Sequence, residues 1–141
     1  MSFLLDTNVV SEWMKPLPNP GVVAWLADAD EDRVFLSVIT FAELRYGIER
    51  LAAGSRRKRL SAWLEGELPV RFEGRILSVD RAVADACGHV VASSEAIGRR
   101  LEAMDALIAA TAAVHQLTVV TRNASDFAAL VDVVNPWQAA G

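Results

Sequence analysis

Short apolar runs alternate with longer segments of helical periodicity along the whole chain. Five of these runs are too short to be helices and are rich in branched or aromatic residues, so each predicts a strand, and the last one predicts an edge strand. They are residues 3–5, 34–38, 75–79, 117–121 and 131–134. Strands that alternate with helices favour a parallel sheet covered on both faces. The pattern therefore predicts one α/β domain over residues 1–141, with a central parallel sheet of four to five strands flanked by helices.

The segments between the strands have the spacing of amphipathic helices. Thr40 is expected to open a helix that runs to about Ala53, and Ser55 to cap a partner helix, so that the two form a hairpin. One face of the first helix carries apolar residues three and four apart: Phe41, Leu44, Ile48 and Leu51. Asp80 is expected to cap a long helix. Residues 69–74 and 93–100 are expected to be connections, because the first begins with Pro69 and the second is polar and contains Gly98. The other predicted helices span residues 9–14, 21–30 and 105–115 and a short segment after the turn at 122–127.

Composition restricts the classes of function. Hydrophobic residues make up 52% of the chain, and 14 Lys and Arg stand against 18 Asp and Glu, which gives a net charge of -4. No global positive field would attract nucleic acid, so any such contact must be local, metal-assisted or supplied by a partner. The single cysteine excludes an internal disulfide, and we predict a cytoplasmic location. The longest stretch without formal charge, residues 106–121, is too short to span a membrane.

Three acidic residues are expected at helix starts, two of them just past a predicted strand. Each has a simple local explanation: Asp6 as an N-cap, Glu43 as the partner of Thr40 in a capping box, and Asp105 as a first-turn charge that the helix dipole stabilises. Together they indicate more, because the carboxyl ends of parallel strands meet at one edge of a sheet. Crowded carboxylates repel one another, and a hard cation such as Mg²⁺ or Mn²⁺ relieves that repulsion. This hypothesis requires the three acids to lie close enough to share one cation.

Other site chemistries have little support. The chain has no Cys-x-x-Cys or His-Glu-x-x-His spacing for zinc, and His89 and His115 stand alone. It has no glycine-rich phosphate loop and no Gly-x-Ser-x-Gly motif. An aspartyl-nucleophile phosphatase or phospho-receiver would need a second acid two residues after Asp6, where Asn8 stands, or a lysine after a later strand, and no lysine follows Lys58.

Five motifs in order resemble the PIN-domain family, and within it the VapC and FitB-like toxins of bacterial toxin–antitoxin pairs. They are LLDTN at residues 4–8, TFAELRYG at 40–47, MDALIAATA at 104–112, TRN at 121–123 and NPW at 135–137. Each motif alone is weakly specific, but five in the same order are jointly strong. The resemblance implies a three-layer sandwich and an endoribonuclease that depends on Mg²⁺ or Mn²⁺.

The resemblance also implies site residues and partners. Asp6, Glu43 and Asp105 match the family's catalytic metal-site positions. Asn123 stands where many relatives have another acid, and it can offer a neutral oxygen, while Asp126 lies three residues later. The implied partners are an RNA substrate and an antitoxin encoded beside the toxin. The implied assembly is a homodimer or a dimer of dimers, which contacts operator DNA only through the antitoxin.

Basic and apolar residues near the helical hairpin are candidates for further contacts. Arg45 and Arg122 are the cations nearest in sequence to the acids and could contact phosphate, although solvated structural roles explain them equally well. The basic run at residues 56–59 could attract RNA or an acidic antitoxin segment, or form a solvated face. The family places an antitoxin groove at this hairpin, where Leu51, Leu60, Trp63 and Leu64 otherwise read as core.

The alternative to a nuclease is a catalytically silent module that acts through antitoxin and operator binding.

Overall fold

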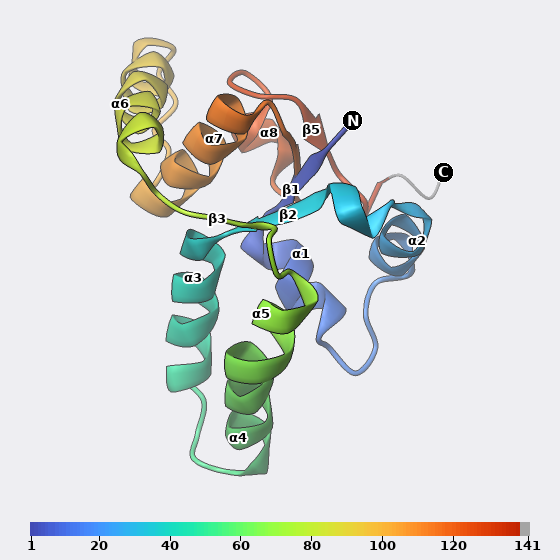
Figure 1. Ribbon diagram of the computed structural model, residues 1–141. Coiled ribbons are helices and arrows are strands. Elements are labelled where there is room, and N and C mark those ends of the chain that lie inside the picture. Colours follow the sequence, from blue (N-terminus) through green and yellow to red (C-terminus); the bar gives the residue numbers. More distant parts are fainter. Residues whose placement is uncertain (139–141) are drawn as a thin grey trace.

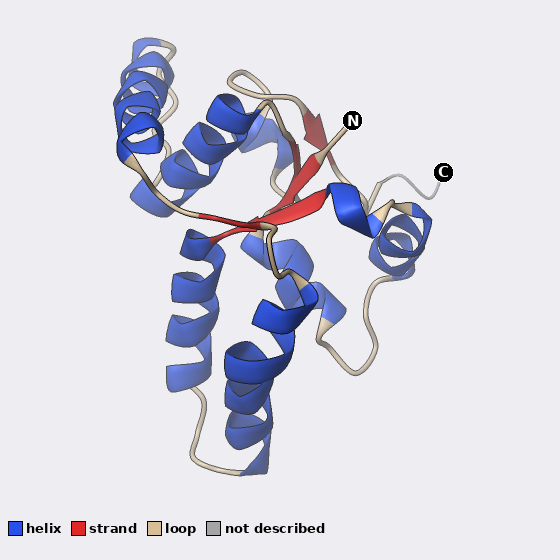
Figure 2. Ribbon diagram, in the orientation of Figure 1, coloured by secondary structure: helices blue, strands red, loops and turns tan. Residues whose placement is uncertain are grey.

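Five short parallel strands lie at the centre of the molecule (Figures 1 and 2). The structure is a computed structural model that describes residues 1–138. The strands are β1 (Phe3–Leu5), β2 (Val34–Ser37), β3 (Ile76–Leu77), β4 (Thr118–Val120) and β5 (Val133–Val134). Their order in the sheet is β3-β2-β1-β4-β5, and every neighbouring pair is parallel. The predicted parallel sheet, with the last strand at an edge, is confirmed.

Helices cover both faces of this sheet, and α3 and α4 form a hairpin that extends away from it (Figure 1). The α-helices are α1 (Thr7–Trp13), α2 (Pro20–Asp28), α3 (Val38–Glu49), α4 (Ser55–Ala62), α5 (Leu68–Arg71), α6 (Arg81–Ala96), α7 (Ala103–His115) and α8 (Ala124–Phe127). A 3₁₀ turn, η1 (Glu31–Arg33), precedes β2, and a π-helical turn, η2 (Trp63–Glu67), joins α4 to α5. Within residues 1–138, no helix is long and apolar enough to cross a membrane.

Alternation along the two central strands produces the three layers. Leu5 and Val120 pack into the core beneath α1 and α3, whereas Leu4 and Val119 pack into a second core beneath α6 and α7. All four side chains are fully buried. Successive strand residues point to opposite faces, so each of the two strands supplies one apolar group to each core. Each buried leucine stabilises the fold by about 1.5–3 kcal/mol. The sheet is thus apolar on both sides, as a parallel sheet requires.

The chain reverses its direction across the sheet between β1 and β4. From β1 it continues to β2 and β3 on one side, and it then crosses to β4 and β5 on the other. In open α/β sheets ligands bind at such a switch point, outside the carboxyl ends of the strands. Asp6 and Thr121 follow β1 and β4 directly, and the Asp6 N–H donates to the Val120 carbonyl at 2.9 Å. The fold therefore places a carboxylate and a hydroxyl at its most favourable ligand position.

Several predicted helix starts are wrong: α1 and α7 begin at Thr7 and Ala103, ahead of the predicted starts at 9 and 105, and α8 occupies part of the predicted turn at 122–127. Helix α3 begins at Val38, two residues before Thr40, because Ser37 caps it by accepting a hydrogen bond from the Ile39 N–H at 3.0 Å. The helix also ends at Glu49, short of the predicted end. Helix α4 begins at Ser55 itself, with Gly54 at the cap position and no side-chain cap bond. Serine and threonine are both good caps, so residue type alone did not select the right one.

The two predicted connections are partly helical. Helix α6 continues to Ala96, because the Ser94 hydroxyl donates to the Val91 carbonyl at 2.9 Å and its polar group is satisfied inside the helix. The helix ends just before Gly98, whose φ is 72°. Helix α5 includes Pro69, which lies in its first turn, where a missing N–H leaves no helical bond unmade.

We predict that Gly21→Ala destabilises the protein by about 1–3 kcal/mol, the usual cost of overpacking. An added Cβ at Gly21 would collide with the Pro136 carbonyl oxygen, where the C-terminal segment crosses the start of α2. The matched control is Gly88→Ala in the interior of α6, where an added Cβ meets nothing within 4 Å. This control should stabilise the protein by about 0.5–1 kcal/mol. Urea unfolding measures both, and equal stability of the two variants would contradict the close approach at Gly21.

Candidate active site

Asp6 is the best-anchored polar side chain at the switch point. Only 4% of it is exposed. Its Oδ1 accepts a hydrogen bond from the Thr7 N–H at 2.8 Å, and its Oδ2 accepts one from the buried Thr121 hydroxyl, also at 2.8 Å. The Asn8 amide donates to the same Oδ2 at 3.3 Å. The bond to Thr7 belongs to the helix cap, but the bond to Thr121 crosses from β1 to β4, which capping does not require.

Burial has a clear effect on this carboxyl. Desolvation raises the pKa of Asp6 above its usual value, and the hydrogen bonds from Thr121 and Thr7 oppose that rise. These donors favour the ionised form and fix its orientation. Asp6 is therefore a rigid, partly desolvated carboxylate that would gain from a nearby positive charge.

Thr7 connects Asp6 to Glu43. The Thr7 hydroxyl donates to Glu43 Oε1 at 2.6 Å and lies 3.2 Å from the hydroxyl of the buried Thr40. The predicted capping box of Thr40 and Glu43 is wrong, because Ser37 caps α3 and places Glu43 in the second turn. Glu43 is thus aimed at the end of β1, and the local explanation for its presence no longer applies.

Asp105 lies in the first turn of α7, as predicted. The pKa of Asp105 rises from 3.8 to about 6, first because the carboxyl is partly buried and next because the charges of Asp6 and Glu43 are close. The charges of Glu102 and Asp126 add smaller contributions in the same direction. The charges of two acids from distant parts of the sequence therefore act on Asp105.

An open pocket of about 720 Å³ contains all three of these carboxylates. Its wall also includes Asn123, whose backbone N–H donates to the Thr121 hydroxyl at 3.0 Å. Asp126, the alternative to Asn123, is exposed and does not line the pocket. The full lining is Asp6, Thr7, Asn8, Ser11, Glu12, Lys15, Ala42, Glu43, Tyr46, Glu102, Met104, Asp105, Arg122, Asn123 and Trp137.

Comparison with known proteins agrees with this geometry. The PIN domain family model matches residues 3–132, which is most of the chain. The chain belongs to the PIN-domain family.

Individual relatives place this PIN domain beside the FitB and VapC proteins. It is 46% identical over 135 residues to the protein named Toxin FitB of Neisseria gonorrhoeae, covering 95% of this chain and 97% of the relative. It is 39% identical over 138 residues to the VapC ribonuclease Y4jK of Sinorhizobium fredii, covering 97% and 99%. A solved structure of FitAB bound to an IR36 DNA fragment has a TM-score of 0.91 at 42% identity, over 96% of each chain. The resemblance to FitB and VapC proteins and the three-layer fold are confirmed.

The donor set of this PIN domain fits a hard divalent cation in its chemistry. Carboxylate and amide oxygens are the ligands that Mg²⁺ and Mn²⁺ prefer. Burial and then the nearby charges of Asp6 and Glu43 raise the pKa of Asp105, and a bound cation would oppose both effects. Among residues 1–138, however, no three Asp, Glu, His or Cys side chains already converge on a single ion position. The three acids share a pocket without yet forming a closed ligand group, so an ion would have to draw their side chains together.

Two acids of the pocket escaped the sequence analysis. Glu102 immediately precedes α7, three residues before Asp105, and this spacing was the available signal. Glu12 is only 7% exposed and accepts hydrogen bonds from Lys15 Nζ at 2.9 Å and from the Asn19 N–H at 2.9 Å. The Lys15 hydrogen bond lowers the pKa of Glu12. No short motif marks Glu12. It lines the pocket because α1 carries it there from the end of β1.

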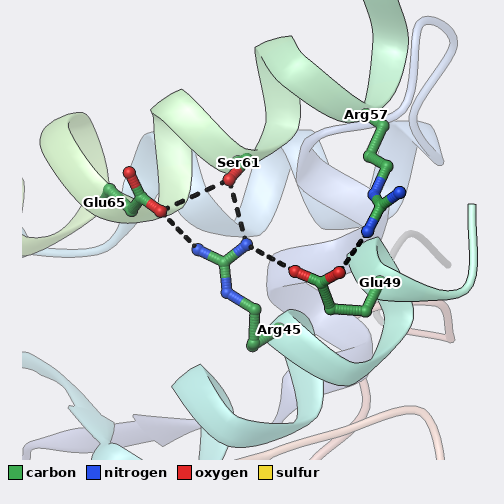
Figure 3. Close-up of polar contacts among 5 residues, drawn as sticks. All are labelled: Arg45, Glu49, Arg57, Ser61 and Glu65. Atoms are coloured by element: carbon green, nitrogen blue, oxygen red, sulfur yellow. Dashed lines mark hydrogen bonds and ion pairs between the residues drawn. The ribbon is translucent and has the colours of Figure 1, made fainter. Parts of the chain in front are cut away.

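Arg45, a candidate phosphate contact, has a structural role instead (Figure 3). Its guanidinium donates to Ser61 Oγ at 2.9 Å and to Glu65 Oε1 at 3.0 Å, and it lies 3.4 Å from Glu49. Glu49 also pairs with Arg57 of α4. This network ties α3 to α4 and η2. Arg45 therefore stabilises the hairpin and does not line the pocket.

We predict that Asp105→Asn stabilises the metal-free protein at neutral pH. Because the native pKa of Asp105 is about 6 and its ordinary value is 3.8, the ionised carboxyl costs stability as pH rises through that window, and the cost is complete above about pH 6. Discounted for solvent screening, the gain should be about 1 kcal/mol, or roughly 2–4 °C in Tm.

Thermal melts in EDTA at pH 7.5 and at pH 4.5 test this expectation. The gain should be present at pH 7.5 and should shrink at pH 4.5. The control is Asp132→Asn. Asp132 precedes β5 and so lies at the amino end of the strands, away from the pocket, and this variant should show no such pH dependence. A lower Tm for Asp105→Asn at pH 7.5 would mean that Asp105 serves mainly to stabilise the start of α7.

Proposed function

We propose that this PIN domain is a Mg²⁺- or Mn²⁺-dependent endoribonuclease and the toxin of a toxin–antitoxin pair. The observation that carries the proposal is the gathering of Asp6, Glu43 and Asp105 in one open pocket at the switch point of the sheet. Its relatives support it, since one is named a toxin and another a VapC ribonuclease.

The residues of the pocket have distinct parts in this chemistry. Asp6 is the fixed ligand, because Thr7, Asn8 and Thr121 hold both of its oxygens. Glu43 and Asp105 are the ligands that complete the site. A bound divalent ion supplies charge neutralisation and a water of lowered pKa, which can attack a phosphodiester.

Asn123 has a secondary part. Its exposed side-chain amide, close to Thr121, could accept a hydrogen bond from a water in the pocket or offer its oxygen to the cation. A neutral amide binds a second cation less strongly than a carboxylate would, so the pocket alone would hold one metal, and a second would need the substrate as well.

An apolar groove on the helical hairpin fits an antitoxin segment. Its volume is about 740 Å³, and Leu51, Leu60 and Trp63 contribute to its wall. Trp63 is 9% exposed, and Leu44, Ile48 and Leu64 are buried beside it, so the hairpin core continues to the floor of the groove. Arg56 and Arg59, both exposed, lie at its rim. An apolar floor with a basic rim suits an amphipathic segment that carries acidic residues.

Contact with operator DNA is proposed only through the antitoxin. The chain has an overall negative charge, and its similarity to FitAB bound to DNA is consistent with a complex in which the partner supplies the DNA contacts. The homodimer or dimer of dimers, the cytoplasmic location and the RNA substrate stay predictions.

We predict that the purified protein cleaves RNA in Mg²⁺ or Mn²⁺ and that EDTA abolishes the cleavage. Asp6→Asn removes the fixed carboxylate, and kcat/KM should fall by at least about 10²–10³-fold, as for the loss of a preorganised charge in other active sites. Asp132→Asn makes the same chemical change at the opposite edge of the sheet and should leave the rate unchanged. Absence of metal-dependent cleavage with every RNA tried would favour the silent module.

We predict that the groove retains a small protein encoded beside this gene. Co-expression followed by affinity purification of the PIN domain should recover both chains. The double variant Arg56→Glu/Arg59→Glu should reduce the recovered partner, because an acidic segment would then meet like charges at the rim. Arg33→Glu/Arg81→Glu, which makes the same change in charge away from the groove, should retain the partner. Equal recovery with both double variants would contradict an acidic segment in this groove.

A further inference from the structure

Arg122 is the cation of the acidic pocket that has no acidic partner among residues 1–138. Two basic residues line the pocket, Lys15 and Arg122. Lys15 Nζ is paired with Glu12 Oε1 at 2.9 Å. Arg122 makes no ion pair with any of residues 1–138, although its charge is close enough to Glu12 to help lower the pKa of that carboxyl. The guanidinium is thus exposed at the pocket wall and available to an incoming anion.

The chain around Arg122 holds it in place from three sides. Its backbone N–H donates to Asn8 Oδ1 at 3.3 Å, and its carbonyl accepts from Asn135 Nδ2 at 3.2 Å. Asn135 Oδ1 also accepts from the Trp137 N–H at 3.0 Å, and this turn brings the indole beneath the guanidinium. The Arg122 Cζ lies 5.5 Å from the centre of the Trp137 ring, within the range of a cation–π interaction.

Trp137 is itself anchored, so this stacking can orient the arginine. The indole is half-buried and packs against the core formed by α1–α5 and the sheet. Arg122 immediately follows Thr121, the buried donor to Asp6. The same short loop therefore fixes the central carboxylate through one residue and presents a cation to the pocket through the next.

A polyanionic substrate would need such a cation. Glu12, Glu43, Glu102, Asp6 and Asp105 all line the pocket, and an RNA phosphate that entered it would meet their combined negative charge. A guanidinium can bind two phosphate oxygens at once with charge-assisted hydrogen bonds. The other candidate, Arg45, is used in the α3–α4 network.

We propose that Arg122 binds a phosphate of the RNA backbone next to the acidic pocket, and that Trp137 is the positioning residue that orients its guanidinium. This inference rests on the proposed ribonuclease function and adds to it the residue that attracts the substrate phosphate. Arg122 contacts the substrate backbone and not the bases, so it contributes affinity without selecting a sequence.

The test uses labelled single-stranded RNA 20-mers of random sequence, with cleavage followed in Mg²⁺ and binding followed by fluorescence anisotropy in Ca²⁺. Arg122→Gln should raise KM and Kd by about 10-fold, the effect of one charge-assisted hydrogen-bonded contact, and should change kcat less than KM. It should also lower the slope of log Kd against log salt by about 0.7, the value for one lost phosphate contact on a single strand. Arg122→Lys, which keeps the charge, should retain the salt slope and recover part of the affinity.

Two further variants separate positioning from general effects. Trp137→Leu should raise KM by less than Arg122→Gln, and in the double variant the two effects should not add, because both act through the same guanidinium. Arg33→Gln is the matched control for charge. Arg33 is exposed, pairs with Asp30 at 3.8 Å and precedes β2 at the opposite edge of the sheet, so this variant should leave KM and the salt slope unchanged.

The outcomes for the two proposals are distinct. If the wild-type protein cleaves the RNA and Arg122→Gln, with an unchanged Tm, shows the wild-type KM and salt slope, the phosphate contact is wrong and the ribonuclease proposal stands. If Trp137→Leu and Arg122→Gln have additive effects, Trp137 does not act through Arg122. If the wild-type protein neither cleaves nor binds the RNA, the proposed function fails and this inference fails with it.

Discussion

The structure depends on one buried carboxylate at the centre of its sheet. Asp6 follows the middle strand at the point where the chain reverses direction, and the two neighbouring layers leave it 4% exposed. Burying an ionised group is costly unless hydrogen bonds compensate, and Thr7 and Asn8 at the start of α1 and Thr121 just after β4 supply them. The need to hydrogen-bond Asp6 therefore fixes the polar residues that follow β1 and β4. Two of them also hold other residues of the pocket, since the Thr7 hydroxyl donates to Glu43 and the Thr121 hydroxyl accepts from the Asn123 N–H.

The clustered carboxylates of the pocket lower the stability of the protein, and the proposed function would need them. Helices α3 and α7 bring Glu43 and Asp105 into the pocket of Asp6, and the pKa of Asp105 rises to about 6, first through partial burial and next through the charges of Asp6 and Glu43. A protein selected for stability alone would separate these charges, whereas the proposed metal-dependent nuclease would need them together. The fold tolerates the strain because both faces of the sheet bury complete apolar cores, to which each central strand contributes leucine or valine.

Positive charge in this chain acts locally. The net charge of -4 gives no general attraction for nucleic acid, so each cluster of basic residues has a separate use. Arg45 and Arg57 join the two helices of the hairpin (Figure 3), and Arg56 and Arg59 lie at the rim of its groove. Arg122 is the basic residue presented to the acidic pocket without an acidic partner among residues 1–138, and it lies beside the residue that fixes Asp6.

The sequence by itself determined the strands, the parallel sheet and the three acids, because apolar periodicity reports which faces are buried and parallel strands bring their carboxyl ends to one edge. It did not decide between Ser37 and Thr40 as a helix cap, since both are good caps and only the length of β2 selects the first. Only the tertiary structure separated Arg45 from Arg122 and added Glu12 and Glu102 to the pocket. The physical reason is that hydrogen bonds, ion pairs and stacking between side chains act over a few ångströms in space, and their partners here are many residues apart in the chain.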